Sequence, residues 1–463
     1  MTDKTKPIHI KRLKQARSDS CQIAKNSSTL QLLIAKNRFA MTENASVKKK
    51  ETAISEDWIV VFLGFVIIAI SLFVFIIPSP SFSWKNGEEL SGKIGTAENL
   101  IAIFIQFGLV LLIALLSAFF TKKPLRPFLI VSPLVWLLSL IALVLAGNSV
   151  IKSFNLEAVI FSLSIGLIIG NLFTLPDWFR AALSTELFVK IGLVILGTSV
   201  IFSDILKAGS LGLIQALVVV ISVWYFAFWI CKKLKLDEEL SLMLSSAVSI
   251  CGVSAAIATA GAIKGDPKKL SYVISLVLIT AIPMMIFMPY LAKQMGLSQE
   301  VTGAWLGGSI DTTGAVVASG TLVGEIALKI STIVKFSQNV LLGLAAFAIS
   351  IYWTYSKKNS ENTTTTKPTL SLIWERFPKF VLGFLAASLL FSFFLSTETV
   401  ATVKDSLKNI QTLWFVLAFT SIGLETKFSD LFNSSSRKPL YAFLIAQLFN
   451  IVITLIVAYL LFR

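Results

Sequence analysis

Long apolar blocks constrain the fold of this chain more than any other feature of its sequence. Stretches of about 20 mostly apolar residues recur between residues 58 and 462, and short charged segments separate them. A helix needs about 20 residues to cross the roughly 30 Å hydrocarbon layer of a bilayer. Charged residues make up only 14% of the 463 residues, whereas a soluble domain has about a quarter. The sequence therefore predicts an all-α, polytopic membrane protein.

Eleven of these blocks are expected to cross the membrane fully, and two further segments, 241–263 and 302–325, look unusual. Gly, Ala, Ser, Thr or Cys fill thirteen of seventeen positions in 245–261 and thirteen of nineteen in 302–320. Broken backbone at membrane depth is tolerated only inside protein or beside a cavity. We therefore expect two broken or re-entrant helices, with two tightly packed ordinary helices as the alternative. The expected full spans are 58–78, 100–120, 128–146, 156–174, 187–204, 211–231, 270–292, 329–353, 378–396, 412–430 and 438–462.

The basic loops favour re-entrant segments over full crossings. If the N-terminus is cytoplasmic and both unusual segments enter and leave on one side, the basic loops fall mainly on the cytoplasmic side. This distribution follows the positive-inside rule. A full crossing of 241–263 would instead place Lys264, Lys268 and Lys269 outside.

Polar segments precede and divide the predicted membrane domain, 58–462. Residues 1–57 hold twelve Lys/Arg and six Asp/Glu, so we expect a basic, disordered tail, with contact to anionic lipid as the alternative. The remaining positive charge is spread over short loops, which argues against a nucleic-acid groove. Translation could begin at Met1 or at Met41. The stretch 354–370, which contains KKNSENTTTTKP, is expected to be a polar cytoplasmic linker.

A short motif occurs twice along the chain. LGTSVIFSDIL at 196–206 and IGLETKFSDLF at 422–432 share an apolar-Gly pair, four variable residues, Phe-Ser-Asp and two apolar residues. Each copy comes just before a long apolar helix. Four predicted crossings separate the copies, so they would run in opposite directions. Weak internal similarity of this kind is typical of the inverted repeats of transporters, and a chance match is the alternative.

Three ionisable residues lie within the predicted spans, where a charge costs at least about 2.5–3.5 kcal/mol. Lys190 is close to the start of its span, so its ammonium could simply reach the interface. Lys335 lies on a polar helix face, which we expect to line a cavity, with a structural polar network as the alternative. The neighbours of Lys335 on that face are Ser331, Thr332, Gln338 and Asn339.

The third ionisable residue, Asp311, lies in GGSIDTTGAVVASG. Thr312 and Thr313 precede a small apolar run, a pattern typical of a helix N-cap, and Gly252 and Ser254 precede another such run. Two half-helix N-termini that meet at mid-membrane would point free N–H groups and positive dipole ends at one spot. Such a pocket prefers an oxyanion. Asp311 would then hold a lysine, a coupling cation or a proton, and a structural Asp N-cap is the alternative.

These features predict secondary active transport of a small anion by alternating access. The expected substrate-binding residues are Cys251, Gly252, Ser254, Thr312, Thr313, Lys335, Gln338 and Asn339. Asp311 and Lys190 are expected to balance charge, with Na⁺ or H⁺ as the coupling ion and no other cofactor.

Catalysis is not expected. The only histidine is His9, and the three cysteines form no CxxC pair, which argues against a His-based metal site or a catalytic triad. A Na⁺ or H⁺ exchanger or channel that uses Asp311 is the alternative function. An intramembrane enzyme with Ser254 and Lys335, and a structural or sensor role, are further hypotheses.

Five segments carry a resemblance to a known family. They are LFVKIGLVILGTSVIFSDILKAG, SSAVSICGVSAAIATAGAI, GAWLGGSIDTTGAVVASG, GEIALKISTIVKFSQNVLLG and FVLAFTSIGLETKFSDL. In this order they resemble the YeiH-like family of sulfate exporters, over roughly 156–460, and the Cys-Gly-x-Ser-Ala motif at Cys251 is fairly specific. Many members have a His before the Asp and a Gln after it, where this chain has Ile310 and Gly314 or Ala315.

That family is grouped with bile acid and arsenite transporters, whose fold has inverted repeats and broken helices. The resemblance implies a secondary transporter of a small anion, such as sulfate or an organosulfonate, in the inner membrane of a bacterium. The lipid bilayer and the anion are the expected partners, and a homodimer is left open.

Overall fold

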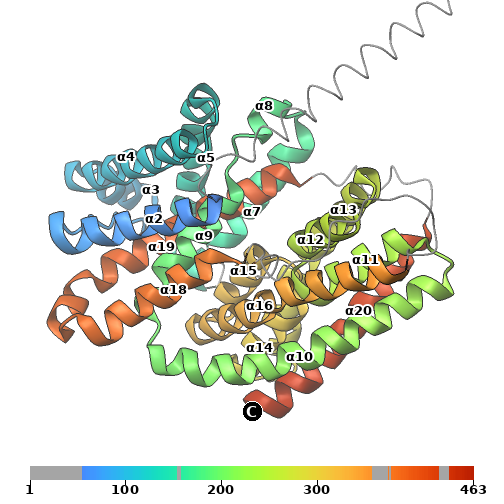
Figure 1. Cartoon of the computed structure of the whole chain (residues 1–463). Helices are drawn as coiled ribbons and strands as arrows, with labels where there is room; N and C mark the ends of the chain where they lie inside the picture. Colours follow the sequence, from blue (N-terminus) through green and yellow to red (C-terminus); the bar gives the residue numbers. More distant parts are fainter. Residues whose placement is uncertain (1–54, 154–157, 357–373, 375–376, 427–436) are drawn as a thin grey trace, which may run out of the picture. The chain divides into compact units, whose positions relative to one another are not determined.

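The computed structural model describes residues 55–153, 158–356, 374, 377–426 and 437–463 (Figure 1). Within these ranges the regular elements are helices, apart from one isolated bridge between Trp84 and Asn148. The predicted all-α class is therefore confirmed. Most of the predicted tail and most of the predicted linker lie outside the described residues, and the first described helix begins at Glu56.

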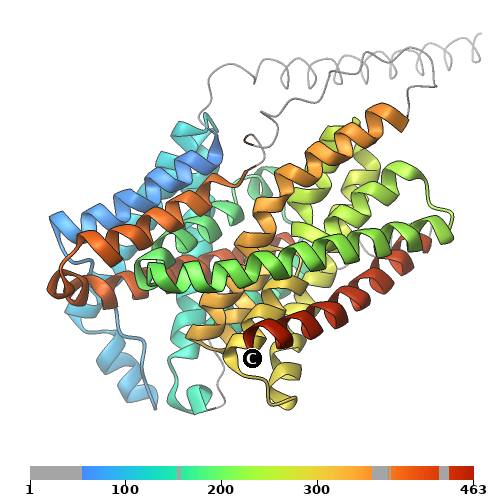
Figure 2. The same ribbon diagram turned by 60° about the horizontal axis from the view of Figure 1, so that its bottom comes forward.

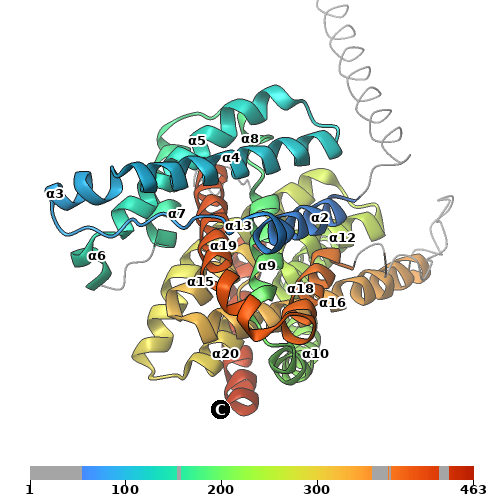
Figure 3. The same ribbon diagram turned by 90° about the vertical axis from the view of Figure 1, so that its left-hand side faces the viewer.

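Two groups of helices make up the described body, and the helices of each group pack mainly on one another (Figures 1 and 3). The flanking group contains α2 (Glu56–Ala69), α4 (Ala97–Phe120), α5 (Leu125–Ala146), α7 (Ala158–Leu172), α9 (Thr185–Leu196), α18 (Lys379–Leu389) and α19 (Thr397–Glu425). The hairpin group contains α10 (Phe202–Lys233), α11 (Glu238–Ser246), α12 (Val253–Ile263), α13 (Pro267–Gln294), α14 (Gln299–Ser309), α15 (Thr313–Val323), α16 (Glu325–Ser356) and α20 (Lys438–Phe462). Shorter helices are α3 (Gly87–Glu89), α6 (Ser149–Ser153) and α8 (Asp177–Arg180).

Eight helices of the described chain are long and apolar enough to cross a membrane. Three of the eleven expected spans are not among them. Those at 156–174 and 378–396 correspond to shorter apolar helices, Ala158–Leu172 and Lys379–Phe394. The span expected at 412–430 overlaps the end of α19, which also carries charged residues such as Lys408 and Glu425. A multi-pass membrane protein is confirmed, and the count of eleven stays a prediction.

Helices α10 and α20 lie side by side and run in opposite directions (Figure 2). Each follows one copy of the repeated motif. The first copy is described: Gly197 directly follows α9 as its C-cap, and Phe202 and Asp204 lie in the first turn of α10. In the second copy, Gly423 lies within the last turn of α19, which runs to Glu425, whereas Phe428 and Asp430 lie outside the described residues.

The first small-residue segment is interrupted at Gly252, as its composition predicts. Helix α11 runs into a π-helical turn, η4 (Ala247–Cys251), and α12 starts anew at Val253. Gly252 has φ +60° and ψ −112°, a conformation that favours glycine because it has no Cβ. A Cβ there would also lie 2.6 Å from Val277 Cγ1. Residues 238–263 therefore form a broken unit, called hairpin 1 here.

The two ends of hairpin 1 lie next to each other. Lys269 Nζ, at the start of α13, lies 2.7 Å from Asp237 Oδ1, at the start of α11, and the Asp266 amide donates to Glu239 Oε2. Hairpin 1 therefore enters and leaves at one place, as the basic loops predict. Burial alone would raise the pKa of Asp237, but the hydrogen bond and charge of Lys269 hold that pKa below its usual range.

The second small-residue segment, hairpin 2 (299–323), is also broken. Helix α14 ends at Ser309, the backbone of Ile310 and Thr312 is extended, and α15 begins at Thr313. Thr312 Oγ1 accepts a hydrogen bond from the Ala315 amide, at 3.3 Å. The N-cap is thus Thr312, and the alternative of Asp311 as the cap is wrong.

Hairpin 2 starts and ends at one place too, because a Cβ on Gly324 would lie 2.5 Å from Gln299 Oε1. Helix α13 joins the hairpins, and its 28 residues span about 42 Å. The hairpins therefore approach from opposite ends of α13. Their tips meet, since a Cβ on Gly252 would lie 3.1 Å from Asp311 Cβ.

Candidate functional site

The ammonium group of Lys335, on α16, joins the tips of the two hairpins. Lys335 Nζ donates to the carbonyl oxygens of Ile250, at 2.9 Å, and Ile310, at 2.8 Å. Its third donor goes to Gln338 Oε1, at 2.9 Å. The Lys335 side chain is only 1% exposed. All three N–H groups of Lys335 are therefore used to hold hairpin backbone and a neighbouring side chain.

Gln338, one turn further along α16, continues this arrangement. Its Nε2 donates to the carbonyls of Ser249 in hairpin 1, at 3.0 Å, and Gly308 in hairpin 2, at 3.2 Å. These carbonyls belong to the last turns of helical segments, which have no intrahelical donors and carry partial negative charge. Lysine and glutamine side chains carry N–H donors, so they can form hydrogen bonds with the free carbonyls at such a helix end.

Two side chains of helix α20 form further hydrogen bonds with carbonyls at the same helix ends. Gln447 Nε2 donates to Ser309 O, at 2.8 Å. Asn450 Nδ2 donates to Val248 O, at 3.1 Å, and also to Ser309 O, at 3.2 Å. The C-terminal ends of α14 and of the η4 segment are thus fixed by α16 and α20 together.

The N-terminal ends of α12 and α15 face a cavity instead. The first amides of a helix have no intrahelical carbonyl partner, and here two such helix starts border one space of about 240 Å³, the tip cavity. Its polar and charged lining consists of Asp57, Glu186, Lys190, Cys251, Ser254, Thr312, Thr313 and Asn339. This is the juxtaposition that the sequence predicts.

Two polar side chains at this cavity have capacity to bind a ligand. Ser254, in the first turn of α12, is exposed. Asn339 is 5% exposed, and its Nδ2 donates to Thr313 Oγ1 at 3.4 Å. Its Oδ1 has no hydrogen-bond partner in the described part of the chain. Asn339 could therefore reorient toward a bound solute.

The charge at the tip cavity comes from Lys190 on α9. Lys190 Nζ lies 3.0 Å from Asp57 Oδ1 and 3.2 Å from Glu186 Oε2, and 5.5 Å from the centre of the Phe380 ring. Asp57 Oδ2 also accepts from the backbone amide of Lys379. Lys190 is thus held in an ion-pair network across α2, α9 and α18. Whether its ammonium also reaches the membrane interface stays an alternative.

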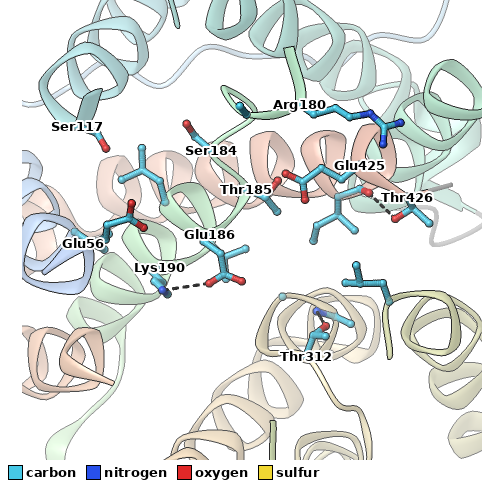
Figure 4. A pocket seen from close by; sticks show the side chains of 18 of the residues that line it. Glu56, Ser117, Arg180, Ser184, Thr185, Glu186, Lys190, Thr312, Glu425 and Thr426 are labelled. Carbon is cyan, nitrogen blue, oxygen red and sulfur yellow. Dashed lines mark hydrogen bonds and ion pairs between the residues drawn. The ribbon is translucent and has the colours of Figure 1, made fainter. Parts of the chain in front are cut away.

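A second cavity, of about 310 Å³, adjoins the tip cavity and shares Glu186, Lys190 and Thr312 with it (Figure 4). Its lining adds Glu425 and Arg180. Figure 4 shows these two side chains on the same side of the space. Nε and Nη2 of Arg180 are buried without a hydrogen-bond partner among the described residues. The combined space therefore carries charges of both signs.

The sequence-predicted site residues divide into two sets. Cys251, Ser254, Thr312, Thr313, Asn339 and Lys190 line the tip cavity, and Gly252 is the buried break beside it. Lys335, Gln338 and Asp311 border neither cavity and are at most 2% exposed. The two sets meet at the hairpin tips, but the first set lines the cavity and the second is buried among protein groups.

Sequence reasoning missed several residues of this region. Gln447 and Asn450 are an i, i+3 polar pair in an otherwise apolar helix, the same signal that singled out Lys335 and Gln338. Glu186, four residues before Lys190, could have been found from its spacing. The pairing with Asp57 had no signal in the sequence, since it joins residues 133 positions apart.

Comparison with known proteins gives a family and no activity. Residues 130–442 match the family described as conserved hypothetical protein 698. A UPF0324 membrane protein of Rhodopirellula baltica is 41% identical over 369 residues, which is 77% of this chain and 67% of that protein. One of Nitratidesulfovibrio vulgaris is 38% identical over 340 residues, which is 71% of this chain and 58% of that protein.

A further UPF0324 membrane protein, from Nitrosomonas europaea, is 31% identical over 318 residues, 61% of this chain and 64% of that protein. The chain thus spans only about three fifths to two thirds of the length of these relatives. No solved structure matches. The chain belongs to the conserved hypothetical protein 698 family, whose relatives named above are UPF0324 membrane proteins.

Proposed function

We propose that the protein is a secondary transporter that moves a small anion across the bacterial cytoplasmic membrane by alternating access. The observation that carries this proposal is that the N-termini of α12 and α15 border one cavity. Unpaired N–H groups and the positive ends of two helix dipoles favour an anion at such a place. Sulfate or an organosulfonate has suitable charge and size for a space of about 240 Å³.

The side chains around the tip cavity support an oxyanion ligand. Ser254 and Thr313 offer hydroxyl donors, and Asn339 offers an amide. Lys190 offers a charge, although Asp57 and Glu186 hold it in the state described. We infer that an arriving anion competes with the Glu186 carboxylate for Lys190, since both present oxygen acceptors to the same ammonium.

This proposal changes the expected role of Lys335. Because its three donors bind Ile250, Ile310 and Gln338, it would act on the anion through the position of the hairpin tips and through its charge. Direct coordination of the anion then falls to the residues of the tip cavity.

Alternating access is supported by the division into two groups of helices and by the repeated motif. The antiparallel course of α10 and α20 (Figure 2) is what an inverted repeat of the motifs at 196–206 and 422–432 requires. The two groups would move against each other around the tip cavity.

The alternative of cation exchange through Asp311 has less support. Asp311 is 2% exposed and borders neither cavity, so a cation carried by it would have no described path. The carboxyl therefore fits a coupling role better than a pathway role.

Transport in proteoliposomes tests the proposal. Wild-type protein should take up radiolabelled sulfate or an organosulfonate above the level of empty liposomes. Lys190→Met and Ser254→Ala should each lower the rate about tenfold, the effect of losing one hydrogen bond to a charged group. Lys293→Met, which removes an exposed lysine remote from both cavities, should match wild type. Anion uptake unchanged in the cavity variants, or Na⁺ or H⁺ flux without any anion flux, would contradict the proposal.

A further inference from the structure

Two of the charged side chains that line the second cavity have no ion-pair partner. Lys123 Nζ lies 3.1 Å from Glu56 Oε1, and Lys190 belongs to the network described above. Arg180, the last residue of α8, and Glu425, the last residue of α19, also line this cavity. Within the described ranges neither of them forms an ion pair. Among these residues the cavity therefore holds one free positive charge and one free negative charge.

The guanidinium of Arg180 lacks acceptors along one edge. Its Nε and Nη2 atoms are buried, and neither has a hydrogen-bond partner in the described part of the chain. The N–H groups of Nε and Nη2 point the same way, so together they match two oxygens of one carboxylate or one tetrahedral oxyanion. Buried donors without an acceptor are unfavourable, and native structures generally supply a partner. An oxyanion with two free oxygens is the partner that this edge of Arg180 requires.

The Glu425 carboxylate offers the opposite charge in the same space. Glu425 is exposed, and Figure 4 shows it on the same side of the cavity as Arg180. The charges of Arg180 and Glu425 interact, yet both groups stay available to a solute because no ion pair joins them. A primary ammonium has three N–H donors and would pair with the carboxylate. Apolar side chains of α13 complete this part of the lining: Leu278, Ile282 and Met285.

We propose that the second cavity binds a small organic zwitterion, with its carboxylate or sulfonate on Arg180 and its ammonium on Glu425. A net charge of zero matches one free cation and one free carboxylate, whereas an inorganic anion alone would leave Glu425 unpaired. The apolar side chains of α13 would contact the carbon chain between the two charges. The assignment of this class to the transported solute rests on the transport proposed above, whereas binding itself does not.

The second cavity also gives such a solute a route to the hairpin tips. Thr312, the N-cap of α15, lines both cavities, and so do Glu186 and Lys190. An acid group that leaves Arg180 can therefore reach the N-termini of α12 and α15 without leaving the combined space. Its ammonium would meet the Glu186 carboxylate there. Arg180 and Glu425 would thus select the solute, and the helix N-termini would hold its acid group.

Thermal unfolding of the purified full chain in detergent measures this selection, because a ligand that binds only the folded protein raises its Tm. The probes are 3-aminopropane-1-sulfonate and 4-aminobutanoate, which carry an ammonium. Their matched anions are propane-1-sulfonate and butanoate, which have the same carbon spacer without the ammonium. At equal concentration and ionic strength, at least one probe should raise the wild-type Tm about 3 °C or more above its matched anion. The probe that does so identifies the acid group.

Two variants assign the preference to residues. Glu425→Gln keeps the size of the side chain and removes its charge, so the probe and its matched anion should give equal Tm rises. Arg180→Lys keeps the charge but loses the pair of parallel N–H groups, so the Tm rise with the probe should fall by about half or more. The matched controls Glu398→Gln and Arg437→Lys replace exposed residues outside both cavities and should respond as wild type does.

Three results would overturn the zwitterion site. One is a wild-type Tm that rises equally with each probe and its matched anion. Another is a full response to the probe in Arg180→Lys. The third is a preference for the probe that persists in Glu425→Gln, which stays measurable if Arg180→Lys does not fold. Sulfate uptake that depends on Ser254 would still support the proposed transport in each case, so the two failures are distinguishable.

Discussion

The two faces of the hairpin tips differ in what satisfies their backbone groups. On one face, the carbonyls that end η4 and α14 are bound by Lys335 and Gln338 of α16 and by Gln447 and Asn450 of α20. On the other face, the first turns of α12 and α15 border a cavity. A broken helix exposes a negative and a positive end at the same point. In this protein the negative ends are closed by its own side chains, and the positive ends are available to a ligand.

Replacing the lysine on each face by methionine should give the largest loss of Tm and the largest difference between two variants. Lys335→Met leaves the carbonyls of Ile250 and Ile310 without their donor, and each buried unsatisfied group costs about 1–3 kcal/mol. The Tm should fall by several degrees. Lys190→Met, on the cavity face, should lower Tm much less, because Lys190 is 21% exposed in its ion pairs. Equal Tm losses in the two variants, measured by thermal unfolding, would break the comparison.

The break in hairpin 1 should tolerate no side chain. Gly252→Ala puts a Cβ at φ +60° and 2.6 Å from Val277 Cγ1, at a cost of about 1–3 kcal/mol. Thermal unfolding should show a lower Tm for this variant. In the control variant Gly108→Ala, in α4, the new Cβ has no atom within 4 Å. This variant should be slightly more stable than wild type, because alanine has a higher helix propensity than glycine. A Gly252→Ala variant as stable as Gly108→Ala would show that the break does not need glycine.

The Glu186 carboxylate should compete with the transported anion for the Lys190 ammonium on the cavity face. Glu186→Gln removes one of the two carboxylates that hold Lys190, so the apparent affinity for the transported anion should rise about three- to tenfold, the equivalent of roughly 1 kcal/mol. The Tm should change little, since the Glu186 side chain is 79% exposed. Concentration-dependent uptake gives the affinity. A weaker apparent affinity in Glu186→Gln would mean that this carboxylate helps to bind the solute.

The smallest effect is expected where hairpin 1 begins and ends. Lys269→Met removes the ion pair with Asp237, whose side chain is 46% exposed, so it should cost under about 1 kcal/mol at pH 7. The pKa of Asp237 is lowered in the folded protein. The pair therefore stabilises above the unfolded pKa and loses this contribution as pH falls through the folded value. The Tm difference from wild type should shrink at pH below the usual Asp value of 3.8, and a constant difference would exclude the pair as its cause.

Composition and small-residue density were sufficient to predict the helical class and the two interruptions. Glycine and small side chains leave a local signal, because they weaken a helix and permit close backbone approach. Gly303 and Gly307 show the second effect, since a Cβ on either would lie within 3.0 Å of backbone atoms of α16. The number of membrane spans was harder to predict, because the end of α19 combines apolar and charged residues.

The cavity lining was predicted in part. Ser254, Thr312 and Thr313 could be identified because helix starts have a local pattern. The hydrogen bonds from Lys335 to backbone carbonyls could not be predicted, because they depend on how two hairpins far apart in the sequence meet. The same holds for the pairing of Asp57 with Lys190, in which long-range packing decides the contact.

Cysteine accessibility tests the contrast between the two faces most directly. In the full chain without its native cysteines, Ser254→Cys lies on the cavity face, and Ser249→Cys lies on the closed face, where Ser249 is 0% exposed. A small charged thiol reagent should modify Ser254→Cys in membranes, and sulfate or an organosulfonate should slow that reaction, while Ser249→Cys stays unmodified. Rapid modification of Ser249→Cys together with a protected, anion-insensitive Ser254→Cys would contradict the account.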